Sequence, residues 1–323
     1  MKLEVEQLDR QGNIHQHTIS MNKLAFAKHF AIAGQHYEPH ISKLLRILGV
    51  FLMYSNYLDG DSYKKNRFSE PPIEFSDPTS KAQFSNLAGR AIADFLSKRI
   101  DKCCFTVNYE AAMRIKKIPI KGSRADLIGF TEDQKTISIE AKGLCQRSIS
   151  KGEMEKYKQQ SRNGGLKVDY SIACVSYNLY ERVRCKYHDP EGEEVKFDSE
   201  LFRNLTKNYY SGLSSFIHSD FISDFITETR EFGSEEFIIV NLGRLFYYHK
   251  IPFVNNYLWQ DRFFYEYLSQ YSLILPGNIE ELADKGLNKP LPPFPLHASE
   301  GDRHSGRDWY IDNDRVGIMK EGW

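Results

Sequence analysis

The sequence lacks an excess of charge of either sign. Its 323 residues contain 43 Lys and Arg and 43 Asp and Glu, so the formal net charge at pH 7 is zero. Proteins that coat nucleic acid without sequence preference are usually basic overall, and this total argues against that class. Any contact with nucleic acid must therefore depend on the local distribution of charge.

Cysteine is scarce, and no CxxC pair occurs. The chain has five cysteines, several of them inside apolar runs: Cys103, Cys104, Cys145, Cys174 and Cys185. We expect these residues to be reduced and mostly buried, acting as small apolar side chains, which fits a cytoplasmic protein.

Long apolar runs are also missing. The chain begins Met-Lys-Leu-Glu-Val-Glu, without the apolar stretch of a signal peptide, and the apolar run over residues 44–52 is short and interrupted by Arg46. We therefore expect neither a secretory signal nor a membrane span. No Walker A loop, dinucleotide fingerprint or Gly-x-Ser-x-Gly motif is present either.

What the chain does contain is material for a core. Hydrophobic residues make up 41% of the sequence and aromatic residues 13%, values typical of globular proteins and not of disordered ones. The length allows one large domain or two ordinary ones.

The order of predicted elements is clearest in the middle of the chain. Apolar periodicity and turn residues predict a helix, three strands, a helix and a strand. These elements cover residues 84–100, 103–109, 124–130, 136–141, 151–162 and 170–177. We assign this α/β core to residues 81–185, and expect a helical N-terminal segment over 1–80 and a mostly helical C-terminal segment over 186–323. The N-terminal segment should hold a short strand over 1–9 and helices over 22–33 and 39–57. The C-terminal segment should hold helices over 201–226 and 258–271, a strand over 237–242 and a terminal hairpin over 310–317.

Three charged residues lie where two predicted strands form a hairpin. Glu140 and Lys142 are two residues apart, so their side chains point to the same face of the strand. The hairpin brings Asp126, at the start of the preceding strand, alongside them. Carboxylates at such a place can bind Mg²⁺ or Mn²⁺ with help from the Ala141 carbonyl, and the lysine can position water or stabilise a phosphoryl transition state.

This pattern resembles the PD-(D/E)-x-K nuclease superfamily. The resemblance consists of Asp126, thirteen intervening residues and then Glu140-Ala-Lys142, within the order of elements that this superfamily shares. It implies a restriction-endonuclease-like fold, metal ligands Asp126, Glu140 and Ala141, and catalytic residues Asp126, Glu140 and Lys142. The implied activity is metal-dependent hydrolysis of DNA.

The sequence departs from the family pattern in places. Ala125 replaces the proline of the motif, which is common among members. The acidic residue that many members carry on the first helix has only Asp94 as a counterpart, and a supporting Gln on the second helix would correspond to Gln159 or Gln160.

Basic residues accumulate next to the motif. Residues 111–167 contain 13 Lys and Arg against six Asp and Glu, an arrangement that suits a phosphate backbone approaching a metal. We expect the nucleic-acid contacts to come from this basic strip, defined as Lys116, Lys117, Lys121 and Arg124.

Other features have simpler explanations. His297 and His304, beside Glu300 and Asp302, are typical of surface loops. Asp312-Asn-Asp314 is typical of a turn and lacks the other positions of a calcium-binding EF-hand loop. Aromatic residues over 259–271 could stack on bases, although this spacing more often indicates a core or a partner interface.

Several alternatives remain open. Glu140 and Lys142 could be the exposed charged end of an edge strand. The helical flanks resemble those of nuclease subunits in bacterial antiphage systems that act with a helicase or ATPase, and a homodimer is also possible. The chain could instead be an autonomous sequence-specific restriction endonuclease, or an interaction protein that has lost catalysis.

Overall fold

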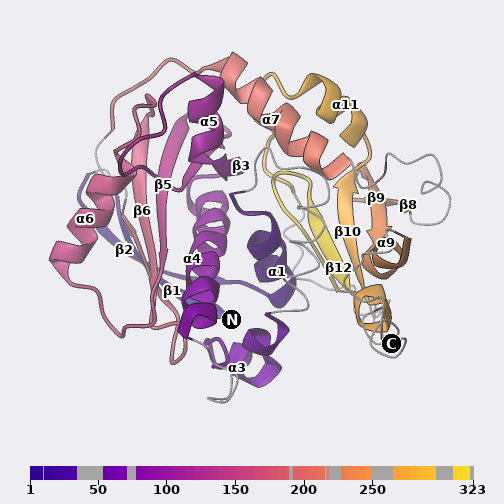
Figure 1. The fold of residues 1–323 in the computed structure, drawn as a ribbon, viewed down its shortest axis with the longest axis horizontal. Helices are drawn as coiled ribbons and strands as arrows, with labels where there is room; N and C mark the ends of the chain where they lie inside the picture. Colours follow the sequence, from indigo (N-terminus) through magenta and orange to yellow (C-terminus); the bar gives the residue numbers. More distant parts are fainter. Residues whose placement is uncertain are drawn as a thin grey trace.

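The chain forms a mixed α/β structure built on two sheets, seen here in a computed structural model (Figure 1). The structure describes residues 1–9, 11–34, 54–70, 78–188, 192–214, 217, 227–248, 265–295 and 308–320. Among these residues, no helix combines the length and apolar character needed to span a bilayer.

The larger sheet has seven strands in the order β2-β1-β7-β6-β5-β4-β3. Their bounds are β1 Lys2–Leu8, β2 Ile14–Ser20, β3 Cys103–Asn108, β4 Leu127–Thr131, β5 Thr136–Gly143, β6 Tyr170–Tyr177 and β7 Arg184–His188. β4 pairs antiparallel with both β3 and β5, whereas β5 pairs in parallel with β6. β1 joins the sheet by pairing in parallel with β7.

Helices cover both faces of this sheet near β5. The helix α4 (Pro78–Ile100) packs on one face, and α6 (Lys151–Ser161) packs on the other. A capping box at Ser150 and Glu153 fixes the start of α6. The strand β5, which carries Glu140 and Lys142, therefore lies inside the sheet and between two helical layers.

The contact between α4 and β5 is made by backbone against backbone. A Cβ on Gly89 would lie 2.3 Å from the Gly143 nitrogen, and a Cβ on Gly143 would lie 1.8 Å from the Ser85 carbonyl oxygen. Glycine is required at both positions because any larger residue would collide with main-chain atoms. This contact fixes the end of β5 against the helix.

The predicted order of elements in the core is present. The helix, the three strands, the second helix and the fourth strand appear as α4, β3, β4, β5, α6 and β6. One element was not predicted, the short helix α5 (Tyr109–Ile115), which begins directly after β3 with Asn108 as its N-cap. It fills the connection between β3 and β4.

The expectation of a helical N-terminal segment is only partly correct. The helix α1 (Lys23–Ile32) matches the prediction, with the Asn22 side chain accepting a bond from the Ala25 amide. It follows a β1–β2 hairpin, of which only the first strand was predicted. A 3₁₀ turn (Ser55–Leu58) and α3 (Gly60–Lys64) come next, and most of the helix expected over 39–57 lies outside the described residues.

The C-terminal segment, expected to be mostly helical, combines helices with strands in the part described, and the strand expected over 237–242 and the terminal hairpin expected over 310–317 are present. This segment contributes a second sheet of five strands in the order β11-β12-β10-β9-β8. Their bounds are β8 Thr227–Phe232, β9 Glu235–Asn241, β10 Tyr271–Pro276, β11 Asp308–Ile311 and β12 Gly317–Lys320. Its helices are α7 Ser199–Ser214, α9 Leu242–Tyr248 and α11 Ile279–Lys285. β10 is buried along nearly its whole length, and β9 buries Phe237, Ile239 and Val240, so both strands supply apolar side chains that the sheet covers.

Candidate active site

Asp126 lies at the point where the chain enters β4, beside β5. Its amide donates to the Ile139 carbonyl, and its Oδ2 accepts a bond from the Ala141 amide at 3.0 Å. These two bonds fix both the backbone and the carboxylate of Asp126 against β5. The Asp126 side chain remains 26% exposed, so the site is open to solvent at this residue.

Glu140 and Lys142 share the face of β5 that is directed toward α6, as their spacing predicts. The Ser138 hydroxyl on the same face donates to the Ser161 carbonyl of α6, whereas Gly143 on the opposite face meets α4. The Lys142 ammonium lies 2.5 Å from Glu140 Oε1 and 3.9 Å from Asp126 Oδ2. The structure therefore brings Asp126, Glu140 and Lys142 together.

β5 is not an edge strand. It pairs with β4 on one side and β6 on the other, and the Glu140 side chain is 0% exposed. The alternative of an exposed, charged strand end is wrong, because a carboxylate is buried here at the cost of its hydration.

The buried Glu140 carboxyl has an unusual environment. Desolvation raises its pKa, the neighbouring Asp126 charge raises it further, and Lys142 opposes both, leaving a pKa of about 8. Burial alone would lower the pKa of Lys142, but the two carboxylates outweigh this effect and raise it. The Lys142 ammonium forms an ion pair with Glu140 Oε1, but within the described residues no hydrogen bond of good geometry reaches either carboxyl oxygen. The buried carboxyl is thus compensated by an ion pair and not by a set of hydrogen-bond donors.

Those oxygens fit a hard divalent cation. Buried carboxyl oxygens that lack donors are costly unless a cation or a proton compensates them. Mg²⁺ commonly binds through one or two carboxylates and keeps several waters, so Asp126, Glu140 and the Ala141 carbonyl suffice as protein ligands. Within the described residues, no group of three or more His, Cys, Asp or Glu side chains is placed to hold a metal, so the fit depends on water completing the shell.

Two helices place further side chains around the site. From α4, the Arg90 guanidinium lies 4.0 Å from Asp126 Oδ1 and is 28% exposed. From α6, the ring of Tyr157 lies 5.9 Å from the Lys142 ammonium. The Gln160 amide donates to the Arg124 carbonyl at 3.2 Å and so supports the segment that leads into Asp126. Gln159 is exposed, and Gln160 is the one that touches the site segment.

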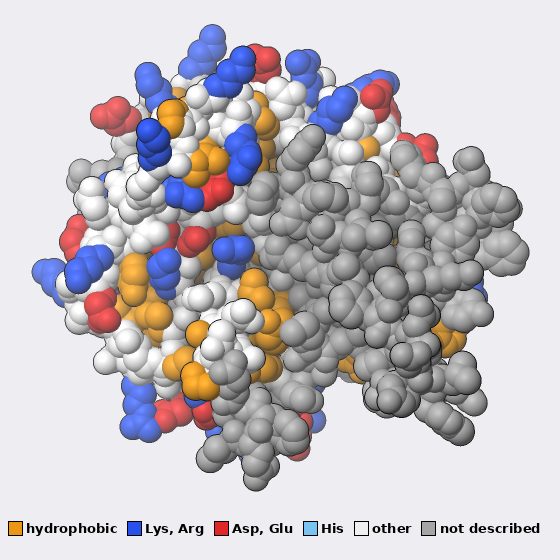
Figure 2. Space-filling model, viewed as in Figure 1, with side chains coloured by type: hydrophobic (Ala, Val, Ile, Leu, Met, Phe, Trp, Pro, Cys, Tyr) orange, Lys and Arg blue, Asp and Glu red, His pale blue; other side chains and the backbone are white. Residues whose placement is uncertain are grey.

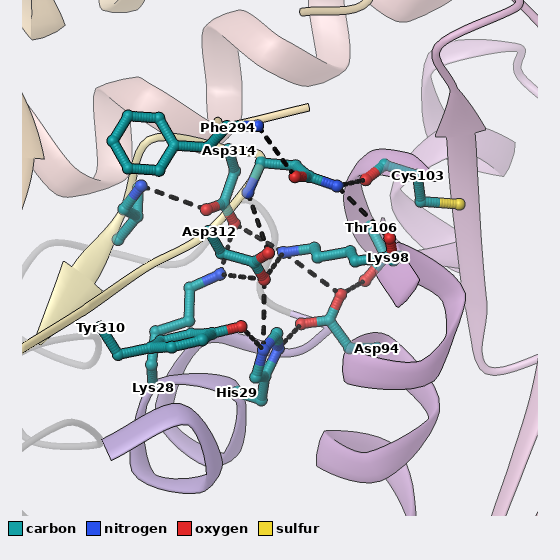
Figure 3. Close-up of polar contacts among 12 residues, drawn as sticks. Lys28, His29, Asp94, Lys98, Cys103, Thr106, Phe294, Tyr310, Asp312 and Asp314 are labelled. Atoms are coloured by element: carbon teal, nitrogen blue, oxygen red, sulfur yellow. Dashed lines mark hydrogen bonds and ion pairs between the residues drawn. The ribbon is translucent and has the colours of Figure 1, made fainter. Parts of the chain in front are cut away.

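Asp94 does not join this site. Its carboxylate bonds to His29 Nδ1 at 2.7 Å and to the Thr106 hydroxyl at 2.8 Å, and it lies 3.6 Å from the Lys98 ammonium (Figure 3). Lys98 and His29 hold the pKa of Asp94 well below its usual range, despite burial that acts in the opposite direction. The carboxylate is therefore part of a separate, buried arrangement.

That arrangement is a buried charge cluster, defined here as Lys28, His29, Asp94, Lys98, Asp312 and Asp314. It joins α1 and α4 to the turn between β11 and β12 (Figure 3). Asp314 Oδ2 lies 2.6 Å from the Lys28 ammonium and 2.7 Å from that of Lys98, and the Tyr209 hydroxyl donates to it at 2.8 Å. The sequence had indicated only a turn here. The polar sequence of this turn gave no sign that Asp312 and Asp314 are buried.

Two of the four residues of the basic strip form ion pairs with carboxylates. Lys116 pairs with Asp198, and Arg124 bonds to Glu110, with its Nε 2.8 Å from Glu110 Oε1. Lys117 and Lys121 are exposed, and no carboxylate in the described part of the chain pairs with them. Figure 2 shows Lys and Arg side chains along the upper and left parts of the face, with acidic side chains among them. Lys117 and Lys121 are the strip residues most open to a phosphate.

Other expectations have mixed outcomes. Four cysteines are buried, Cys145 is exposed, and all five are free thiols, as predicted. His297, Glu300, Asp302 and His304 lie outside the described residues. So do residues 259–264 of the aromatic run, whereas Tyr271 begins β10 and is not part of the helix expected there.

No family model, curated protein or solved structure matches the chain. The interpretation of the site therefore depends on its geometry.

Proposed function

We infer that the chain is a metal-dependent nuclease with Asp126, Glu140 and Lys142 as its catalytic residues. The observation that carries this proposal is the fully buried Glu140 carboxyl on a central strand, ion-paired with Lys142 and close to Asp126. A stable protein has little reason to bury such a group, so its presence favours function over structure. The order of α4, β3, β4, β5, α6 and β6 supports a restriction-endonuclease-like core.

The proposed roles follow from position. Asp126, oriented by the Ala141 amide, and Glu140, ionised when a cation is near, would hold Mg²⁺ or Mn²⁺ with the Ala141 carbonyl. Such a cation polarises a phosphoryl oxygen and lowers the pKa of bound water. The Lys142 ammonium neutralises both carboxylates. A bound cation would neutralise them in its place, and the ammonium would then be available to a phosphate or an attacking water.

DNA is the substrate that we propose, entering past Lys117 and Lys121. The neutral total charge favours a second determinant of target choice. We propose that a helicase or ATPase partner, or a second copy of the chain, supplies it, in the setting of antiphage defence and in the cytoplasm.

The test is cleavage of supercoiled plasmid, linear duplex, single-stranded DNA and RNA, each with Mg²⁺, Mn²⁺ or EDTA. The assay is run with the chain alone and with the product of its genomic neighbour. Lys142→Met should abolish cleavage. Lys135→Met is the matched control, because Lys135 lies on the same hairpin but pairs with Asp133 at its turn.

Two results would count against the proposal. Cleavage that persists in EDTA would remove the metal from the mechanism. Equal activity of Lys142→Met and Lys135→Met would show that Lys142 has no catalytic role, and the mechanism that the superfamily resemblance implies would then not apply.

A further inference from the structure

A cavity of about 650 Å³ lies away from the candidate active site. Its walls come from the β1–β2 hairpin, the start of α1, the end of α3, the last turns of α4 and β11. Pockets of this size commonly hold small molecules or cofactors. None of the residues that line it belongs to the nuclease motif.

The lining carries positive charge and no negative charge. Three cationic side chains take part, Lys2, Lys64 and Arg99, and no Asp or Glu is among the lining residues. The Asp61 carboxylate lies 3.9 Å from the Lys64 ammonium, but both side chains are more than four-fifths exposed, and such a surface pair is weak. The border of the cavity therefore carries a net positive charge.

The start of α1 adds to this potential. Asn22 and Ala25, which form the N-terminal cap of the helix, both line the cavity. The N-terminus of a helix favours anions, since its amides and dipole point toward them. Neighbouring cations are crowded here: burial lowers the pKa of Lys23, and Lys320 and Lys64 lower it further against the opposing effect of Asp59.

Arg99 is held in place by aromatic rings. Its guanidinium carbon lies 5.2 Å from the ring of Phe95 and 5.9 Å from that of Tyr310, and one of its nitrogens is 3.3 Å from the Tyr310 hydroxyl. A guanidinium fixed in this way is preorganised for a phosphate. Apolar side chains, including Ile19 and Met21, complete the wall and suit the uncharged part of a ligand.

We propose that this cavity binds a phosphate-bearing ligand of nucleotide size. Its phosphate would meet Lys2, Lys64 and Arg99, and its ring would lie on the apolar wall. The ligand is either a free nucleotide or the end of a nucleic-acid strand, which share this chemistry. The same helix, α4, places Arg99 at the cavity and Arg90 beside Asp126, so the two sites have an element in common. The binding does not rest on the nuclease proposal.

Calorimetric titration of the full chain with ATP, AMP, inorganic phosphate and a short oligothymidylate tests this site without any activity assay. We expect ATP and AMP to bind more tightly than phosphate. Lys2→Glu with Lys64→Glu should weaken binding by roughly tenfold or more, because charge-assisted contacts are lost. Arg99→Met, checked for an unchanged fold by circular dichroism, should do the same.

The matched control is Lys102→Glu with Lys285→Glu, which changes the net charge equally at lysines 63% and 68% exposed outside the cavity. It should bind like the wild type. Oligothymidylate binding alone, with the same dependence on Lys2 and Lys64, would support the site and assign its ligand to a strand end. No binding of any nucleotide, binding of inorganic phosphate alone, or equal loss in the control would overturn the proposal.

Discussion

Replacing Glu140 by Gln should remove a pH-dependent instability from the metal-free protein. The Glu140 pKa is raised from 4.5 to about 8. A carboxyl with a raised pKa stabilises the fold while it is protonated. Its contribution is complete below pH 4.5 and is lost as the pH rises through about 8. Gln is neutral at every pH and cannot lose that contribution.

The size of the effect follows from the shift. One pKa unit corresponds to about 1.4 kcal/mol, so the full shift gives roughly 5 kcal/mol as an upper limit, of which at most about 4 kcal/mol falls between about pH 5 and about pH 9. Urea unfolding in EDTA, from about pH 5 to about pH 9, measures it. The free-energy difference between wild type and Glu140→Gln should change over this range in favour of the variant. Any constant cost of the substitution cancels in that comparison.

Two further arms make the test specific to the site. Asp126→Asn removes the second-largest cause of the shift, so its stability should depend less steeply on pH than that of the wild type. Added Mg²⁺ should restore stability to the wild type at high pH and have little effect on Glu140→Gln. A difference between wild type and Glu140→Gln that stays constant with pH would refute the reasoning, because Glu140 would then titrate as an ordinary carboxyl.

Three more perturbations test other parts of the structure. Lys117→Glu with Lys121→Glu should weaken DNA binding and reduce the slope of log affinity against log salt by about two units, measured by fluorescence anisotropy; an unchanged slope would place the DNA elsewhere. Gly89→Ala should destabilise the fold by about 1–3 kcal/mol in urea unfolding, since its Cβ would lie 2.3 Å from the backbone of β5; a neutral effect would mean that α4 is not fixed there. Asp314→Asn should cost about 3–5 kcal/mol by the same measurement, and adding Lys98→Met should recover part of the loss; additive losses would argue against coupling.

The parts of the fold that the sequence predicted are those with strong local periodicity. The apolar spacing of α4, the alternation of β3 and the apolar run of β6 marked these elements closely, and the period of two in β5 placed Glu140 and Lys142 on one face. The strand β2 was missed because Ile14–Ser20 is exposed along most of its length and has no buried face to produce alternation. The strand β7 was missed because Arg184–His188 is short and rich in charge, and one of its two partners, β1, lies far away in the chain.

The environment of the site was less predictable than its residues. The spacing of Asp126, Glu140 and Lys142 indicated the cluster, but the pKa of Glu140 depends on burial by α6 and the sheet around it. Asp94 was an ambiguous candidate for the active site because its surroundings, too, depend on residues from other parts of the chain. Its partner His29 is 65 residues away in the chain, and no local pattern reports such a contact.

The buried charge cluster has a consequence for modularity. Its aspartates at the β11–β12 turn come from the last part of the described chain, whereas Lys28 and Lys98 come from α1 and α4. A fragment that ended near residue 185 would lose those aspartates together with the hairpin that covers both ammonium groups. The segment over residues 81–185 therefore depends on the β11–β12 hairpin, and a transplant of that segment into another protein would have to carry this hairpin with it.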